Sequence, residues 1–177
     1  MESKLPAAPL DPSHIAADGE HNPVQTAGQT WLNGWHGPGL APKGRRHGSN
    51  GICLTAKGES VLVTEDGARW DLPGGRPEGD ETWEQTLRRE MREEACADVG
   101  TATLLGFARG RCIEGHERGL VLVRSFWLAE VSLGDWLPKF EILERKLVPA
   151  RELISHLTIE PGFLPIYRRA MVEAGLG

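Results

Sequence analysis

Short apolar, β-branched runs separated by turn-forming residues predict two β-hairpins in this chain. Lys57-Gly58-Glu59 provides the turn of the first hairpin, and the polar segment 114–118 provides the turn of the second. The four predicted strands are residues 49–56, 60–65, 101–113 and 119–131.

The segment between the two hairpins changes to the period of a helix. Thr82, with Gln85 three residues later, forms a capping-box pattern, so Thr82 is the predicted N-cap. Residues 83–95 contain no Gly or Pro and are rich in good helix formers. We therefore expect a helix over this stretch, with a Gly-rich loop before it.

Two further helices are predicted near the end of the chain. One is short, over residues 148–157, and one is longer, over residues 165–175. Pro165 suits the first turn of the longer helix, and Gly175 suits its C-terminal cap. The order of hairpin, helix, hairpin and helices predicts an α/β (α+β mixed) fold with a mixed sheet flanked by helices.

Residues 1–47 show a different composition, rich in Pro, Gly, Ala and His, without a sustained period of strand or helix. We interpret them as an irregular N-terminal arm, followed by one domain at residues 48–177. Trp31 and Trp35 are too large and apolar for a free linker, so this part of the arm should pack on its own domain or on a partner subunit.

Composition narrows the function classes. Lys and Arg number 20 against 25 Asp and Glu, a net charge of −5, which argues against a nucleic-acid polymer as partner. Cys53, Cys96 and Cys112 suit neither a disulfide framework nor a zinc cluster, and indicate small side chains in a reducing compartment. No apolar run is long enough for a signal peptide or a membrane span. We expect a cytoplasmic protein without a membrane partner.

The predicted helix over 83–95 carries an unusual acidic sector. At about 100° per residue, its apolar face holds Leu87, Met91 and Ala95. Glu90, Glu93 and Glu94 share one sector, and Glu94 lies at the edge of the apolar face. Like charges at this spacing repel, and a partly buried carboxylate without a partner costs more.

Nearby arginines balance this sector only in part, since Arg88 and Arg92 point away and Arg89 reaches only its edge. A divalent cation such as Mg²⁺ or Mn²⁺ would balance it, because these ions prefer oxygen ligands. The alternative is a solvated acidic face. The preceding Gly74-Gly75 brings bare backbone close and offers a carbonyl as a further ligand, or it simply turns the chain.

These residues resemble the Nudix box, in which Gly, Glu and REUxEExGU recur at fixed separations, with U an aliphatic residue. Gly75, Glu81, the segment 89–94 and Ala97 match the pattern. Cys96 stands where the family has Gly, a position expected to need positive φ and therefore strained for Cys. The resemblance extends loosely over residues 49–174 and implies a Nudix-like α/β/α sandwich.

The resemblance also implies roles for particular residues. The metal ligands would be Glu90, Glu93, Glu94 and the carbonyl of Gly74. Arg89 and Glu81 would orient the helix and the loop. The catalytic base would be Glu93 in the box, or Glu141 or Glu144 beside the last strand.

The implied activity is Mg²⁺-dependent hydrolysis of the pyrophosphate bond of a nucleoside diphosphate linked to another group, with Mn²⁺ as a substitute. The alternative is a non-catalytic Nudix-fold module that binds a nucleotide or a protein. The expected partner is a small nucleotide-type substrate, and a homodimer is allowed. The residues usual for ADP-ribose or dinucleoside polyphosphates are missing beyond the box. Scattered candidates for substrate contacts are Arg69, Arg109, Arg111, Arg118 and Arg124.

Overall fold

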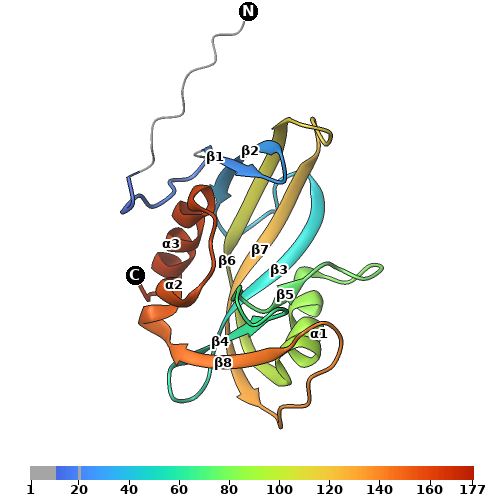
Figure 1. Ribbon diagram of the computed structural model, residues 1–177, viewed down its shortest axis with the longest axis vertical. Helices are drawn as coiled ribbons and strands as arrows, with labels where there is room; N and C mark the ends of the chain where they lie inside the picture. The colour runs from blue at the N-terminus through green and yellow to red at the C-terminus, as the bar shows by residue number, and fades with distance from the viewer. Residues whose placement is uncertain (1–10, 20) are drawn as a thin grey trace, which may run out of the picture.

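The computed structural model describes residues 11–19 and 21–177, and it contains one large mixed sheet with helices on both faces (Figure 1). The sheet follows the order β1-β2-β6-β7-β3-β4-β8, and the short β5 pairs with β3 outside this path. The strands are β1 (Asn22–Thr26), β2 (Gln29–His36), β3 (Arg45–Leu54), β4 (Glu59–Thr64), β5 (Gly74–Gly75), β6 (Ala97–Glu114), β7 (Val121–Leu133) and β8 (Glu144–Pro149).

Both predicted hairpins are confirmed, since β3 pairs antiparallel with β4 and β6 pairs antiparallel with β7. β3 and β7 run parallel, which makes the sheet mixed. The helices are α1 (Trp83–Ala95), α2 (Leu153–His156) and α3 (Leu164–Glu173), with 3₁₀ turns at Ala150–Glu152 and Pro161–Phe163. The predicted fold class is thereby confirmed.

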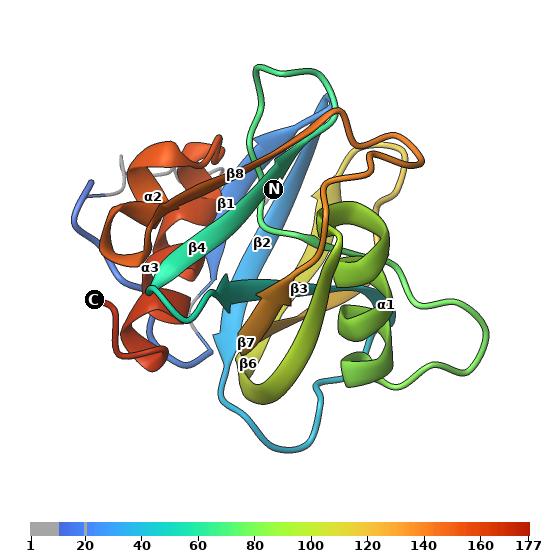
Figure 2. The same ribbon diagram turned by 90° about the horizontal axis from the view of Figure 1, so that it is seen from below.

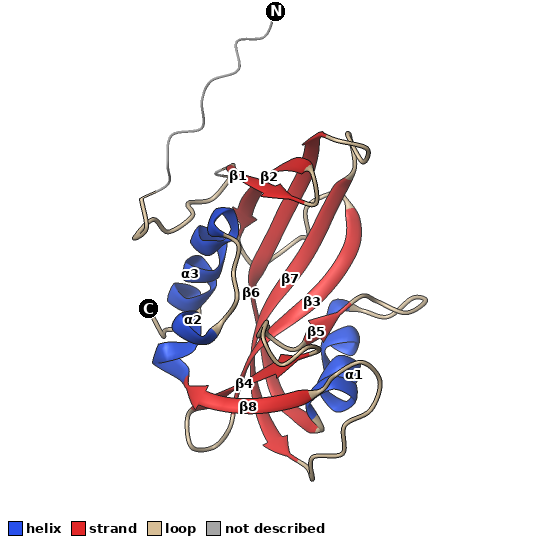
Figure 3. Ribbon diagram, viewed as in Figure 1, coloured by secondary structure: helices blue, strands red, loops and turns tan. Residues whose placement is uncertain are grey.

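The three layers are visible in two perpendicular views. Helix α1 lies on one side of the sheet, and α2 and α3 lie on the other (Figures 2 and 3). Leu87 and Met91 of α1 are fully buried against one face, as the helical wheel predicts. On the opposite face, Ile166 of α3 packs in the cluster that contains Trp35 and Phe126. The sandwich therefore has a separate apolar core on each side of the sheet.

The prediction of an irregular N-terminal arm is wrong for residues 22–36, which form the hairpin β1–β2 at the edge of the sheet. Ala27 and Gly28 both have positive φ, as the tight turn of a two-residue hairpin requires. Most of β2 is buried on both faces, so the sequence shows no alternation of polar and apolar residues. Residues 1–10 of the predicted arm lie outside the described residues.

Trp31 and Trp35 pack on their own domain, which confirms the first of the two alternatives for them. Trp31 is 8% exposed and Trp35 is fully buried. Trp35 lies 5.8 Å from the ring of Phe126 on β7. Across residues 11–19 and 21–177, none of the helices has both the length and the apolar character needed to cross a membrane.

Candidate metal and pyrophosphate site

Helix α1 begins where the sequence predicts. The side chain of Thr82 accepts a hydrogen bond from the Gln85 backbone N–H, and the Gln85 side chain accepts one from the Thr82 N–H at 2.8 Å. This capping box satisfies two otherwise free backbone donors in the first turn. It fixes the start of the helix and therefore the direction in which its carboxylates point.

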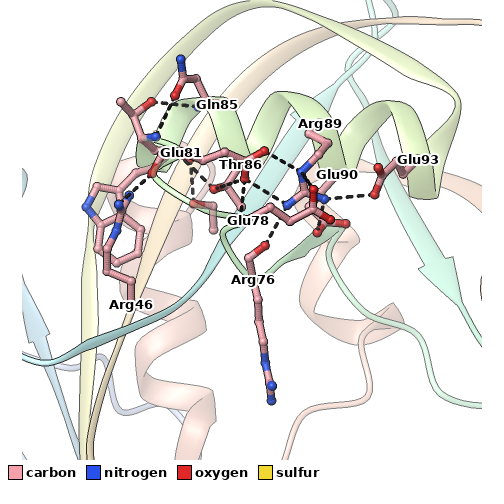
Figure 4. Close-up of polar contacts among 12 residues, drawn as sticks. Arg46, Arg76, Glu78, Glu81, Gln85, Thr86, Arg89, Glu90 and Glu93 are labelled. Carbon is pink, nitrogen blue, oxygen red and sulfur yellow. Dashed lines mark hydrogen bonds and ion pairs between the residues drawn. The ribbon is translucent and has the colours of Figure 1, made fainter.

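Arg89 is the centre of the polar network on this helix (Figure 4). Its Nη1 donates to Glu90 at 2.9 Å and to Glu93 at 3.0 Å, and its Nη2 donates to the Arg76 carbonyl at 2.8 Å. The prediction that Arg89 reaches only the edge of the acidic sector is wrong. A guanidinium carries five donors on a long side chain, so it spans more of the helix surface than its Cβ direction indicates.

Glu81 holds Arg89 in place from the loop before the helix. Arg89 Nε donates to Glu81 Oε1 at 2.7 Å, and Thr86 Oγ1 and the Glu78 N–H donate to Oε2 at 2.9 and 3.0 Å. These hydrogen bonds, led by those from Arg89, lower the pKa of Glu81 to about 2. Glu81 therefore stays ionised and binds the guanidinium of Arg89. The role that the resemblance implies for this pair, orienting the helix and the loop, stays a prediction.

Glu94 lies in a different environment from Glu90 and Glu93. It has no cationic partner in the part of the chain that the structure describes, and its Oε2 accepts a hydrogen bond from the Gly74 N–H at 3.0 Å. Burial, followed by the charge of Glu90, raises the pKa of Glu94 to about 8 against this hydrogen bond. Burial also raises the pKa of Glu90, and the hydrogen bond from Arg89 opposes this shift.

The short Gly74-Gly75 strand lies between β3 and the side chain of Glu90. It pairs with Ser49 and Asn50 of β3, and a Cβ on Gly74 would overlap the Ser49 carbonyl. A Cβ on Gly75 would overlap the carboxylate of Glu90. Close approach of the β3 backbone therefore requires glycine at position 74, whereas a side chain at position 75 would displace the Glu90 carboxylate. The Gly74 N–H contacts Glu94, and the Gly74 carbonyl as a metal ligand stays a prediction.

The candidates for the catalytic base lie in three settings. Glu93 is paired with Arg89, and Glu144 is exposed at the start of β8 opposite Thr64. Glu141 is exposed in the loop before β8, near enough to Glu94 to help raise its pKa. Glu141 therefore lies within electrostatic range of Glu94.

The oxygen donors of the site suit a hard divalent cation. Within residues 11–19 and 21–177, no three His, Cys, Asp or Glu side chains form a ready metal cage, and Arg89 occupies Glu90 and Glu93. Glu94, however, lies beside Glu90 without a positive partner, and both carboxyl groups have raised pKa values. A cation such as Mg²⁺ would relieve this repulsion, so the residues fit the metal that the sequence predicts.

A cavity of about 290 Å³ opens beside Glu94 and the two glycines. Sequence analysis missed most of its polar lining, namely His47, Asn50, Glu65, Asp71 and Arg76, although it included Arg124 among the scattered arginines. Burial, followed by the positive charges of Arg124 and Arg76, lowers the pKa of His47 to about 4. The cavity therefore combines a carboxylate end with a positively charged wall.

Cys96 ends the helix in the left-handed conformation, with φ 50° and ψ 44°. The expected positive φ at this position is confirmed, although the residue is not glycine. Its N–H donates to the Met91 carbonyl, and its Sγ donates to the Leu137 carbonyl at 3.4 Å. The helix therefore ends in the turn that the family pattern implies, with backbone strain at Cys96. The carboxylates that precede Cys96 in the helix keep their positions.

The comparisons of this chain with known proteins agree with one another on its family. The family model described as NUDIX domain matches residues 45–170. A Proteus vulgaris protein named 8-oxo-dGTP diphosphatase is 51% identical over 85 residues, which are 48% of this chain and 66% of that protein. The matched part thus spans slightly less than two thirds of that relative's length.

Solved structures share the fold. A Bacillus subtilis pyrophosphohydrolase has a TM-score of 0.60 at 23% identity, covering 83% of this chain and 92% of its own. The NUDIX domain of Shewanella oneidensis NrtR, solved with ADP ribose, has a TM-score of 0.56 at 16% identity, covering 78% and 94%.

Proposed function

Because the chain belongs to the NUDIX domain family, we propose that it is a Mg²⁺-dependent hydrolase that cleaves the pyrophosphate bond of a nucleoside diphosphate linked to another group. The observation that carries this proposal is the pair Glu90 and Glu94, two carboxyl groups with raised pKa values beside the Gly-Gly strand. A protein without use for a cation gains nothing from this repulsion.

Glu90, Glu93 and Glu94 would hold the cation, with Mn²⁺ as a substitute for Mg²⁺. When bound, the metal neutralises phosphate charge and lowers the pKa of its water. Arg89 and Glu81 would position the helix carboxylates, and Arg89 would have to share Glu90 and Glu93 with the cation. Arg76 and Arg124 line the same cavity and would bind the phosphate oxygens.

Among the base candidates, we favour Glu141, because it is exposed and lies in the electrostatic range of Glu94. Its carboxylate would accept the proton of the attacking water. The other two candidates suit the role of base less well. Glu93 forms an ion pair with Arg89, and Glu144 lies on β8, opposite Thr64. A Glu141→Gln variant should therefore lose more turnover than a Glu144→Gln variant.

The name of the Proteus vulgaris relative supports a nucleoside triphosphate with an oxidised purine as the first substrate to test. We place the enzyme in the cytoplasm with small nucleotides as its partners. Homodimer formation stays a prediction.

The test is a panel of nucleoside triphosphates, dinucleoside polyphosphates and nucleotide sugars, assayed for phosphate-containing products with and without Mg²⁺. The expected result is Mg²⁺-dependent hydrolysis that is lost in Glu94→Gln and retained in Glu84→Gln, a half-exposed first-turn control paired with Arg88. If every substrate fails while a nucleotide binds tightly without metal, the chain is instead a non-catalytic binding module.

A further inference from the structure

The loop that joins β7 to β8, residues 134–143, carries Glu141 and passes beside α1 in both perpendicular views (Figures 1 and 2). Its last part is fixed by Ile142, which is 5% exposed in the apolar cluster that packs against α1 and lines the cavity beside Glu94. Glu141 itself is exposed and has no hydrogen bond or ion pair within the described residues. Its position therefore depends on how the loop is held.

The backbone immediately before Glu141 has an unusual conformation. Phe140 has φ 56°, in the left-handed region, although its side chain is 71% exposed and gains little from burial. A residue in this region persists where the surrounding structure fixes the chain on both sides of it. Ile142 fixes the side that follows Phe140, so the loop needs a second anchor between β7 and Phe140.

Arg145 of β8 provides this second anchor. Its Nη1 donates to the Ala95 carbonyl at 2.7 Å, and both terminal nitrogens lie 3.3 Å from the Gly134 carbonyl. The guanidinium also lies over the ring of Trp136, 5.2 Å from its centroid. A cation stabilises this end of α1, because the last carbonyls of a helix carry partial negative charge. One side chain thus connects the last residue of α1 to the first part of the loop.

This connection leads directly to Glu94. The start of the loop is also joined to the helix end by the Gly134 N–H, which donates to the Cys96 carbonyl at 2.7 Å. Ala95 follows Glu94 in the chain and is fully buried, so the helix end is packed firmly in the core. Arg145 therefore fixes the loop relative to the residue that adjoins Glu94.

An anchor is needed here because Glu141 and Glu94 repel each other as charges. The negative charge of Glu141 is one of the causes that raise the pKa of Glu94, after burial and the charge of Glu90. This repulsion would displace a loosely held loop, and Glu141 with it, away from Glu94.

We propose that Arg145 is a positioning residue for the hydrolysis: it ties the loop to the last turn of α1 and so holds Glu141 beside Glu94. The inference rests on the proposed function, in which Glu141 accepts the proton of the attacking water. Arg145 does not line the cavity beside Glu94, so it acts through Glu141 and not on the substrate.

Steady-state kinetics with Mg²⁺ and a hydrolysed nucleotide of the panel test this role. Arg145→Ala should lower kcat by roughly 10- to 100-fold and change KM by less than about twofold. Arg145→Lys should lose less, because lysine keeps the charge and reaches one carbonyl at a time. Lys146→Ala is the control and should keep the wild-type kcat, because Lys146 is the next residue of β8 and stacks on Trp70, 4.2 Å from the ring centroid.

A double-mutant cycle with Glu141→Gln separates positioning from a general loss of structure. In the Glu141→Gln background, Arg145→Ala should change kcat by less than about twofold, because the group that Arg145 positions is gone. An equal loss in both backgrounds, or a wild-type kcat in Arg145→Ala, would overturn the proposal. Thermal unfolding shows whether each variant folds, and if Arg145→Ala does not fold, the same cycle with Arg145→Lys decides.

Limited trypsin digestion measures the anchoring of the loop without any nucleotide. Lys139 is exposed in the loop, so cleavage after it should be at least about fivefold faster in Arg145→Ala than in the wild type, and unchanged in Lys146→Ala. Unchanged cleavage in Arg145→Ala would overturn the proposal whether or not a nucleotide is hydrolysed. Faster cleavage, together with no hydrolysis of any nucleotide by the wild type, would contradict the proposed function alone.

Discussion

Arg89 and Glu81 form a two-point ion pair, with Nε 2.7 Å from Oε1 and Nη2 3.1 Å from Oε2. This pair joins the loop before α1 to the middle of the helix, eight positions further along the chain. Because both side chains are largely buried, the pair fixes the geometry of the carboxylates that follow it.

Arg89→Lys should lower kcat/KM by roughly 10- to 100-fold, the usual effect of losing a residue that orients metal ligands. Lysine keeps the charge but cannot contact Glu81 at two points while also reaching Glu90 and Glu93. Steady-state kinetics and Mg²⁺ titration measure the effect. Arg92→Lys is the control, because Arg92 is exposed in the same helix and contacts Asp98. Equal activities of the two variants would exclude a positioning role for Arg89.

Glu94→Gln should lower turnover by more than the roughly 100-fold expected for a residue outside the metal shell. The metal-free fold should survive or gain stability, because the change removes a carboxyl group that burial and Glu90 disfavour as a charge. Hydrolysis assays and urea unfolding without metal measure both effects. Activity close to that of the wild type would show that Glu94 does not hold the cation.

The contribution of Glu94 to the free energy of unfolding of the metal-free protein should fall as the pH rises from about 4.5 to about 8. The folded pKa of Glu94, about 8, lies above its ordinary value of 4.5, so the folded state binds a proton that the unfolded chain has released. The stabilising contribution of Glu94 is complete below about pH 4.5 and lost above about pH 8. Urea unfolding of the wild type and of Glu94→Gln at several pH values isolates this contribution, because His47, whose lowered pKa of about 4 acts in the opposite direction, is common to both proteins.

Cys96→Gly should stabilise the protein by up to about 1 kcal/mol, because glycine adopts the left-handed conformation without the cost that a Cβ imposes. The greater freedom of glycine in the unfolded chain and the lost contact with Leu137 offset part of this gain. A rise of roughly 2 to 4 °C per kcal/mol is expected in Tm. A lower Tm would indicate that the Cys96 side chain contributes more to packing than its conformation costs.

The parts of the fold marked by local chemistry were predictable. Thr82 starts α1, Pro165 lies in the first turn of α3, and Gly175, with φ 73°, follows the C-cap Ala174. The hairpin β1–β2 was missed, because most residues of β2 are buried on both faces and the edge strand β1 contains Pro23. Its turn at Ala27-Gly28 gave too weak a signal, since Ala is unusual at positive φ.

The carboxylates of the site could be found from spacing because they lie on one helix. His47, Asp71 and Arg76 could not, because they come from separate elements that meet only in the folded protein. The reach of Arg89 was also underestimated, since a wheel records the direction of a side chain and not its length. The sequence therefore predicts the chemically important residues of α1, whereas the residues of the opposite cavity wall can be identified only from the tertiary structure.

The parallel pairing of β3 with β7 has a consequence for synthesis of the chain. β3 ends at Leu54, whereas β7 begins at Val121, so α1 emerges before the strand that completes its sheet. At roughly 5 to 20 residues per second, translation leaves the helix without this support for seconds. Its apolar face is then exposed beside a dense group of carboxylates, whose charge opposes association between unfinished chains. The acidic residues that repel one another in the folded site thus also give the unfinished chain a local negative charge.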